Sequence, residues 1–554
     1  MVGSSPANDE KASVRTLVFN HLAGIVLAPT VKALWDRKVF DLFRSPSRWT
    51  ELDEIVEHTH GNRGYLRVAL RLLLSVGWME ERISNPGSRR SYALTRDGEL
   101  ATSVAPPLYG EVVSFIPKAV FLEDFLFGSS DEPVRSSLRE LVSRAQARWD
   151  LVLQEGSQED PITAKVHEQI RGHLDGMLVG PALVALARGG ILGQLEQGAV
   201  DFRSIAANHD SLSCVFDLLA TQGWIAHDHN RVWLTACGQY AAQIATSYGV
   251  TVSYLPTFEV LSTLLFGNPR IPRQDETGIE LLVNRGMNVW GSGGAHKTYF
   301  KKVDEIIAEI FNRPLNQQPQ GICDMGCGDG SFLEHLYFVV KNHTARGAAL
   351  DQHPLILVGA DFNKVARRVA KQKLRKTGIP TFHIMGADIN RPAQLASDLE
   401  ELGLDIHDLL HVRSFLDHNR PYLPLANYTK GSRAGRSSGA FAHFGEEIPA
   451  GELEENLVRH LRRWAPYVGR FGLLVLELHT LPPAVTNANL EKTPAVAYDG
   501  THGFSDQYLV ELPIFLDCAR EAGLLADFRF QHKYPPSELA TVSVNFFTST
   551  SPSA

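Results

Sequence analysis

Three glycines that alternate with other residues stand directly behind a short apolar run. In GICDMGCGDGSFLEHL, residues 321–336, Asp324, Gly326, Gly328 and Gly330 lie between that run and an amphipathic pattern. Backbone without side chains lets a ligand approach closely, and a strand followed by a glycine turn and a helix opens a doubly wound α/β sheet. The spacing is not the GxGxxG of dinucleotide-binding folds, and no lysine follows it as a triphosphate site requires.

Two acidic residues stand where the next two strands of such a sheet would end. The apolar run LILVGADFNKVA contains Asp361, and the run TFHIMGADIN contains Asp388. A carboxylate at the carboxyl edge of a strand can accept hydrogen bonds from both hydroxyls of a ribose. Asp388, at the same edge, suits the exocyclic amine of an adenine. The pattern predicts a nucleoside-bearing ligand, and an NAD-binding fold is the alternative that the glycine spacing disfavours.

The glycine turn and the two acidic strand ends, in this order, resemble the class I S-adenosylmethionine-dependent methyltransferases. The resemblance implies that Asp324 and the three glycines hold the methyl donor, that Asp361 binds its ribose, and that Asp388 binds its adenine. It also implies cofactor contacts at Ile389 and Arg413. The apolar runs and amphipathic patterns downstream then predict an α/β fold, a Rossmann-like domain with a seven-stranded sheet.

Ionisable residues gather after the fourth and fifth predicted strands and in the segment that follows. The stretches RSFLDHNRPY, LELHTLPP and YDGTHGFSDQYLVE supply Asp417, His418, His479, Tyr498, His502 and Gln507. One chemistry that fits is a histidine base that removes a proton from a hydroxyl group during methyl transfer. The other is a divalent metal, on histidine and Gln or Asp ligands, that acidifies the α-carbon of a 1,3-dicarbonyl acceptor. Structural roles for these histidines stay open beside both.

These stretches resemble the metal-dependent C-methyltransferases of bacterial polyketide assembly lines, of the type that initiates apratoxin biosynthesis. The resemblance implies C-methylation of a malonyl or β-keto acyl acceptor, with iron or manganese held by His479 and Gln507 and with His502 and His418 as substitute ligands. It implies catalytic roles for His418, Asp417, His479 and Tyr498. Metal-free O-methylation by a histidine base is the alternative function. Whether the acceptor is bound to a carrier protein, a coenzyme A thioester or a free acid stays open.

The N-terminal half contains an internal repeat. LRVALRLLLSVGWMEE followed by SYALTRDG reappears as LSCVFDLLATQGWIAH followed by RVWLTACG. In each copy a helical pattern ends at a Gly-Trp pair, where glycine can adopt the left-handed conformation that stops a helix. A short strand ending in Leu-Thr-x-x-Gly closes each copy. This order predicts two tandem winged-helix-like units, which resemble the N-terminal dimerisation domains of small-molecule O-methyltransferases, so a homodimer is plausible.

Winged helices often bind DNA, which requires a basic recognition helix. The first copy carries Arg63, Arg67 and Arg71 in that helix, whereas ANHDSLSCVFDLLA in the second has no Lys or Arg. The formal net charge of -8 also offers no general attraction to nucleic acid. We therefore expect no nucleic acid partner.

The chain of 554 residues is too long for a single hydrophobic core. The patterns predict a first winged-helix-like unit at 1–135, a second at 136–284 and a methyltransferase domain at 285–554. Apolar runs of membrane-spanning length are not evident, so no membrane partner is expected. The polar start without a signal segment predicts a cytoplasmic location. Five cysteines without a CxxC pair predict free thiols.

Overall fold

The computed structural model consists of two compact units. The N-terminal unit comprises residues up to 295 together with segments 440–447 and 482–506, and the C-terminal unit comprises 296–439, 448–481 and 507–554. The structure describes residues 8–43, 48–84, 89–128, 132–151, 160–228, 230–274, 280–429 and 431–549. Both inserted segments of the N-terminal unit come from the part of the sequence that was assigned to the methyltransferase domain.

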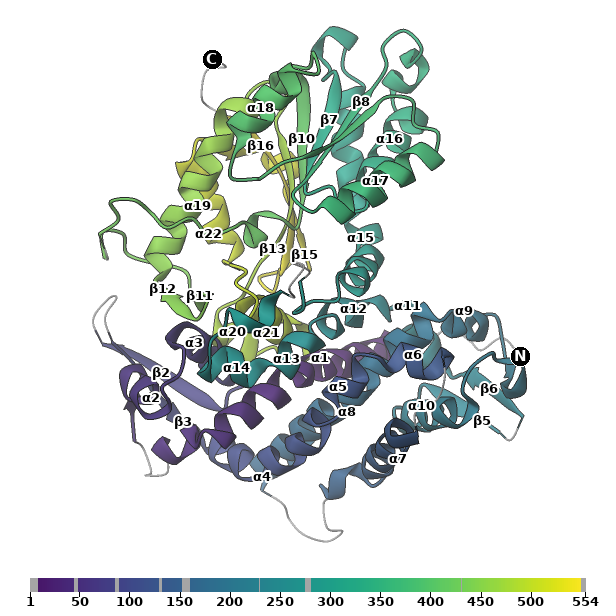
Figure 1. The fold of residues 1–554 in the computed structure, drawn as a ribbon, viewed down its shortest axis with the longest axis vertical. Helices are drawn as coiled ribbons and strands as arrows, with labels where there is room; N and C mark the ends of the chain where they lie inside the picture. Colours follow the sequence, from purple (N-terminus) through teal and green to yellow (C-terminus); the bar gives the residue numbers. More distant parts are fainter. Residues whose placement is uncertain are drawn as a thin grey trace. The chain divides into compact units, whose positions relative to one another are not determined.

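The N-terminal unit contains the same pattern of elements twice (Figure 1). The first copy is α1 (Asn8–Asp36), β1 (Thr50–Glu51), α2 (Leu52–Thr59), α3 (Arg63–Ser75), β2 (Met79–Ser84), β3 (Arg89–Leu94), α4 (Arg96–Val113), α5 (Ile116–Ala119) and α6 (Leu122–Phe127). After α7 (Glu132–Gln146), the second is α8 (Pro161–Arg188), α9 (Ile191–Glu196), β4 (Val200–Asp201), α10 (His209–Thr221), β5 (Ile225–His227), β6 (Arg231–Leu234), α11 (Ala236–Gln243), α12 (Thr246–Val252), α13 (Leu255–Glu259) and α14 (Leu261–Phe266). The matching sheet orders, β1-β3-β2 and β4-β6-β5, confirm the two tandem winged-helix-like units.

The Leu-Thr-x-x-Gly motif has the same structural role in both copies. The Gly98 N–H donates to Thr95 Oγ1 at 3.0 Å, which caps α4. A Cβ on Gly98 would lie only 1.8 Å from the Trp78 carbonyl oxygen, so this position requires glycine. The second copy repeats the cap at Thr235 and Gly238, at 3.0 Å, and the close approach at 1.7 Å. The motif therefore fixes where the last strand of each copy crosses the Gly-Trp turn.

Helices α1 and α8 pack backbone against backbone through a pair of equivalent glycines. A Cβ on Gly24 would lie 2.3 Å from the His173 Cα, and a Cβ on Gly176 would lie 2.4 Å from the His21 Cα. The two histidines and the two glycines occupy the same places in the repeated stretches HLAG and HLDG. The repeat thus includes the long helices, and the two copies share one hydrophobic core.

Helix α1 is the one described helix that is long and apolar enough to cross a membrane by composition. In its most apolar window, 78% of the residues are buried inside the structure. Polar residues such as His21 and Thr30 interrupt the run and are buried as well, which is why the sequence pattern did not single it out.

The C-terminal unit is built on a mixed sheet in the order β14-β16-β13-β10-β7-β8-β9. Its strands are β7 (Gly321–Met325), β8 (Ile356–Asp361), β9 (Phe382–Gly386), β10 (Leu409–Ser414), β13 (Leu473–Leu478), β14 (Leu524–Ala526) and β16 (Val542–Ser549). The pairs among β9, β8, β7, β10 and β13 are parallel, whereas β16 is antiparallel to β13 and β14. The predicted seven-stranded Rossmann-like sheet is confirmed, and β15 (His532–Tyr534) adds an eighth strand beside β16.

Helices cover both faces of this sheet (Figure 1). The end of α15 (Arg285–Phe311) lies on one face with α16 (Ser331–His343) and α17 (Lys364–Lys376), and α18 (Pro392–Glu400), α19 (Ala450–Trp464) and α22 (Leu512–Glu521) lie on the other. In α19 the predicted apolar face, Leu453, Leu457 and Leu461, is buried. The carboxyl ends of the parallel strands remain as the edge where an open α/β sheet binds its ligands.

Candidate functional site

The glycine loop after β7 depends on glycine at each of its three alternate positions. Gly326, Gly328 and Gly330 have φ angles of 81°, 52° and 81°, in the left-handed region that other residues rarely adopt. A Cβ on Gly326 would also lie 2.8 Å from Leu416 Cδ2. Behind the loop, Lys373 Nζ lies 2.6 Å from Asp329 Oδ2 and ties α17 to the start of α16. The conformation of the loop therefore requires glycine at these positions.

Asp361, at the end of β8, is fixed beside that loop. The Gly328 N–H donates to Asp361 Oδ2 at 3.0 Å, and the Asn363 N–H donates to Oδ1 at 2.7 Å. These backbone donors orient the carboxylate while it keeps further acceptor capacity for ligand hydroxyls. The structure thus brings together the two features that the sequence assigned to the methionine and ribose parts of the donor.

A cavity of about 320 Å³ adjoins Asp388 at the end of β9. It is lined by Phe362, Arg367, Gly386, Ala387, Asp388, Arg391, Gln394, Leu395 and Asp398. The Phe362 ring is 84% exposed and offers an apolar surface on which a base can stack. The volume and the mixture of an aromatic ring with polar groups suit an adenine.

Asp324 and the remaining predicted cofactor contacts lie deeper. Asp324 is 1% exposed, and its Oδ1 has no hydrogen-bond partner among the residues that the structure describes. Burial, with a smaller contribution from Asp361, raises the pKa of this carboxyl to about 8. A buried carboxyl with an unused oxygen fits the ammonium group of a methionine. Ile389 is buried beside Asp388, and its carbonyl accepts from Trp464 Nε1 at 2.7 Å.

His418 and Glu477 form a buried pair at the carboxyl ends of β10 and β13. His418 Nδ1 lies 2.5 Å from Glu477 Oε1, and the His418 backbone N–H donates to Oε2 at 3.1 Å. The Leu478 N–H donates to Oε1 at 2.7 Å. A carboxylate on Nδ1 favours the tautomer whose Nε2 can accept a proton. The sequence pointed to His418, but the pairing with Glu477, 59 residues away, needed the structure.

Asp417 points into a buried ionic network instead of joining this pair. Its Oδ1 lies 2.7 Å from Arg413 Nη1 and 2.9 Å from His460 Nε2. Burial disfavours the carboxylate, but the charge of Arg413 and the hydrogen bond from His460 outweigh it and hold the pKa of Asp417 well below its usual range. The Arg413 guanidinium also lies over the Trp464 ring, 4.1 Å from its centroid. Asp417 and Arg413 thus support the turn that presents His418.

His479, the histidine expected to hold iron or manganese, has contacts within the protein at both ring nitrogens. His479 Nε2 lies 2.7 Å from Ser543 Oγ, and Nδ1 lies 3.3 Å from the Val510 carbonyl oxygen. Burial lowers the pKa of His479 to about 3, so the ring is neutral and both nitrogens are engaged. Within the described ranges, no cluster of three or more His, Cys, Asp or Glu side chains could hold a metal ion. Gln507 belongs to the same unit as His479 and is buried.

His502 and Tyr498 belong to the N-terminal unit, in the inserted helix α21 (Ala495–Gly503). His502 Nδ1 lies 2.9 Å from the Tyr498 carbonyl oxygen, one helical turn back, and its ring packs against Tyr254 at 5.9 Å between centroids. His502 is buried in that unit, and Tyr498 is half-buried. This placement gives them structural contacts in α21.

The basic face of α3 binds carboxylates of the two inserted segments. Arg71 Nε lies 2.9 Å from Asp499 Oδ2, and Arg67 Nη1 lies 2.9 Å from Glu447 Oε1. Arg63 Nε reaches the other oxygen of Glu447 at 2.7 Å. The sequence showed the four-residue spacing of these arginines but not their partners. The face that a DNA-binding winged helix would use is engaged within the chain.

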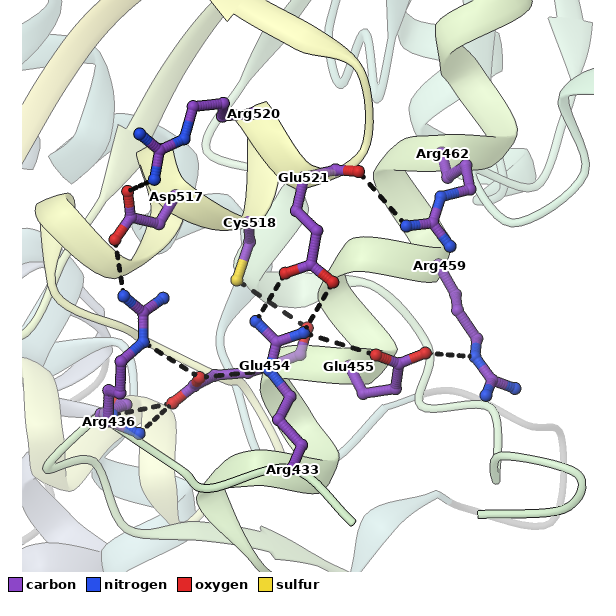
Figure 2. Close-up of polar contacts among 11 residues, drawn as sticks. Arg433, Arg436, Glu454, Glu455, Arg459, Arg462, Asp517, Cys518, Arg520 and Glu521 are labelled. Atoms are coloured by element: carbon purple, nitrogen blue, oxygen red, sulfur yellow. Dashed lines mark hydrogen bonds and ion pairs between the residues drawn. The ribbon is translucent and has the colours of Figure 1, made fainter.

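The glycine- and arginine-rich loop between β10 and α19 is docked on two helices (Figure 2). Arg433 Nη2 lies 2.9 Å from Glu521 Oε2, and Arg436 Nη1 lies 2.6 Å from Asp517 Oδ2, both on α22. Figure 2 shows the fully buried Glu454 of α19 between the two arginines. A basic loop of this kind, with Lys430, Arg433 and Arg436, could bind a phosphorylated arm. Lys430 lies outside the described residues, and the two arginines are neutralised by carboxylates.

Three stretches of the chain match three protein families, each of which is described as a domain of AprA. Residues 14–81 match the AprA N-terminal domain, residues 175–268 the AprA winged helix domain, and residues 280–545 the AprA MT2-like domain. The last is a methyltransferase family, and its match contains the glycine loop, the acidic strand ends and the His418–Glu477 pair. The three matches follow the order of the elements described above.

Several solved methyltransferase structures also resemble this chain. The mitomycin 7-O-methyltransferase MmcR is 15% identical, with a TM-score of 0.41, over 70% of this chain and 98% of that one. Human N-acetylserotonin methyltransferase is 11% identical, with a TM-score of 0.36, over 72% and 100%. The CurJ carbon methyltransferase is 13% identical, with a TM-score of 0.32, over 75% and 99%. No curated protein matches the chain.

Proposed function

We propose, since the chain belongs to the AprA-type S-adenosylmethionine-dependent methyltransferases of natural-product biosynthesis, that it methylates the α-carbon of a β-keto or malonyl-type acyl acceptor. The observation that carries the proposal is the His418–Glu477 pair at the edge of the sheet. A carbon between two carbonyl groups is acidic enough for an imidazole base to remove its proton. The pair supplies such a base.

The donor side of the site holds its cofactor through groups already in place. Bound S-adenosylmethionine supplies a methyl group attached to a positively charged sulfur. Asp361 and the glycine loop bind the ribose and the methionine backbone, and Asp388 with Phe362 binds the adenine. The unused oxygen of Asp324 faces a cationic group without reorganisation, because β7 and the loop fix it.

The acceptor side moves one proton. His418 Nε2 takes the proton from the acceptor carbon while the electron pair of that C–H bond forms the new bond to the methyl group. Glu477 stabilises the imidazolium that results and keeps the ring oriented, as a carboxylate does in other histidine-based sites. Removal of such a base lowers the rate about 10²- to 10⁴-fold.

O-methylation of a hydroxyl group is the second candidate function. The same pair favours it, because a histidine oriented by a carboxylate can also deprotonate a hydroxyl. The family resemblance also implied assistance by iron or manganese. Both ring nitrogens of His479 contact other groups of the protein, so His479 would have to give up one of these contacts to bind a metal.

Intact-mass measurement of methyl transfer separates these possibilities. Acceptors are acetoacetyl- and malonyl-loaded carrier protein and a hydroxylated aromatic compound, each with S-adenosylmethionine and with or without a chelator. We expect a gain of one methyl mass on a loaded carrier, located on the α-carbon by fragmentation, that persists with the chelator. Transfer only to the hydroxylated compound would establish O-methylation, and loss of transfer with the chelator would establish a metal requirement.

A further inference from the structure

Three aromatic side chains from separate elements meet in the C-terminal unit. The Tyr299 ring of α15 contacts the Tyr534 ring of β15 with centroids 4.9 Å apart and planes at 64°. It also contacts the Phe415 ring, which directly follows β10, at 6.1 Å and 66°. All three residues are half-buried, so part of each ring remains accessible. We refer to Tyr299, Phe415 and Tyr534 as the aromatic cluster.

The aromatic cluster lies where the donor side of the site meets the acceptor side. β10 pairs with β7, whose end carries the glycine loop, and Val412 is in register with Asp324. The residue after Phe415 is Leu416, whose side chain fills the space above Gly326. His418 follows three residues after Phe415. A methyl group that passes from the loop of β7 to the base after β10 must cross this boundary.

Phe415 keeps a large side chain in a backbone conformation that disfavours one. Its φ of 55° lies in the left-handed region, and its N–H donates to the Leu476 carbonyl oxygen at 2.8 Å. Glycine or asparagine would adopt this conformation with less strain. Strained residues of this kind occur where the surrounding structure holds a side chain in place for function. The ring of Phe415, and not the turn alone, is therefore the feature to explain.

The hydroxyl group of Tyr534 is a second feature that supports a role in ligand binding. It is buried and has no hydrogen-bond partner within the part of the chain that the structure describes. Burial, with a smaller contribution from Glu305, raises the pKa of Tyr534, so the phenol is neutral. A neutral, unpartnered hydroxyl oxygen can accept weak contacts from the polarised methyl and methylene groups of a sulfonium.

We propose that the aromatic cluster binds the positively charged sulfonium end of S-adenosylmethionine. The faces of aromatic rings attract cations, and several rings around one site are a recurring way to bind quaternary ammonium groups. A sulfonium has the same charge and a similar shape. Once the methyl group has left, the sulfur is a neutral thioether, and the attraction ends. The aromatic cluster therefore favours the methyl donor over its product, S-adenosylhomocysteine.

Calorimetric titration with S-adenosylmethionine and with S-adenosylhomocysteine tests this proposal without any acceptor. The variants are Phe415→Leu and Tyr534→Leu, and Tyr534→Phe keeps the ring while removing the hydroxyl. We expect each leucine variant to weaken binding of the sulfonium ligand about 3- to 30-fold, the range of a cation–π contact. Binding of the thioether should change less than about twofold, and Tyr534→Phe should retain the preference.

Phe528→Leu is the matched control, because its ring is 85% exposed and lies in the same C-terminal region. Retained binding of S-adenosylhomocysteine shows that each variant is folded. Equal weakening of both ligands, or no change in either, would overturn the proposal. The result does not depend on the acceptor, so it stands or falls separately from the carbon-methylation proposal.

Discussion

The two sides of the site at the edge of the central sheet are built in different ways. The donor side, at the ends of β7, β8 and β9, consists of backbone, three carboxyl groups and an exposed ring beside a cavity. The acceptor side, at the ends of β10 and β13, consists of side chains that are almost fully buried and paired with one another. The donor side is a preformed binding surface for a ligand, whereas the acceptor side is a rigid set of contacts that orients one base. Loss of a residue should therefore affect binding on one side and rate or stability on the other.

The sharpest test of this contrast is removal of the base. His418→Ala should lower the rate of methyl transfer about 10²- to 10⁴-fold, because proton removal is lost. The affinity for S-adenosylmethionine should stay within about twofold, since the donor side does not include this ring. Single-turnover kinetics and calorimetry measure the two quantities on the same preparation.

His343→Ala, at an exposed histidine at the end of α16, is the control for the loss of an imidazole. Glu477→Gln should reproduce most of the rate loss while preserving the shape of the site. If His418→Ala kept the wild-type rate on the carbon acceptor, the base would have to be another group.

The buried ionic network of Arg413, Asp417 and His460 should contribute to the free energy of unfolding. Asp417→Ala leaves the Arg413 guanidinium, which is buried and next to the Trp464 ring, without its carboxylate. Breaking a buried pair in this way typically destabilises a protein by about 3–5 kcal/mol. Chemical denaturation of the C-terminal transition measures the effect.

Glu538→Ala is the matched comparison, because Glu538 pairs with Lys533 at the surface of the same unit. Exposed pairs contribute about 0–1 kcal/mol, so this variant should be close to wild type. Similar losses in the two variants would mean that burial of the Arg413–Asp417 pair has no special role.

Substitutions on the donor side should change the affinity for S-adenosylmethionine. Asp361→Ala removes the carboxylate that accepts from the Gly328 N–H and that binds the ribose in our proposal. Hydrogen bonds to a charged group contribute about 1.5–3 kcal/mol each, so the dissociation constant should rise about 10- to 100-fold. The maximal rate at saturating donor should change much less. Asp351→Ala, at an exposed aspartate before β8, should leave both quantities unchanged.

The difference between the two sides also explains what the sequence could predict. Asp324, the glycines and Asp361 lie on a strand, the loop after it and the next parallel strand of a β-α-β unit, so the predicted fold brings them together although Gly328 and Asp361 are 33 positions apart. The sheet itself could be predicted for the same reason. The base pair, in contrast, joins residues 59 positions apart, and the Asp417–His460 contact spans 43 positions. Spacing along the chain carries no signal for such pairs.

His479 and the arginines of α3 show the same limit. His479 stands at the end of β13, where a ligand or base is expected, but strand β16 brings Ser543 to its ring. Arg67 and Arg71 have the spacing of a DNA-binding face, but carboxylates from the inserted segments pair with them. In both cases the contact partner comes from a distant part of the chain, which the local pattern could not indicate.

A pH dependence of the affinity for S-adenosylmethionine should arise from Asp324 on the donor side. The pKa of Asp324 is about 8 in the free protein, so its carboxyl carries a proton at neutral pH. A cationic ligand next to it favours the carboxylate, and binding should release that proton. The affinity for S-adenosylmethionine should therefore rise with pH by at most about tenfold per unit until pH 8 and then level off.

The stability of the ligand-free protein depends on pH in the opposite direction. The folded-state pKa of Asp324 lies above the unfolded value of 3.8, so its contribution is fully present below about pH 4 and is lost as pH rises through about 8. Asp324→Asn should flatten the pH dependence of affinity between pH 6 and 8 and raise the melting temperature of the ligand-free protein above pH 8. Calorimetry in two buffers of different ionisation enthalpy measures the released proton directly. If wild type and Asp324→Asn had parallel pH profiles, the titrating group would belong to the ligand and not to Asp324.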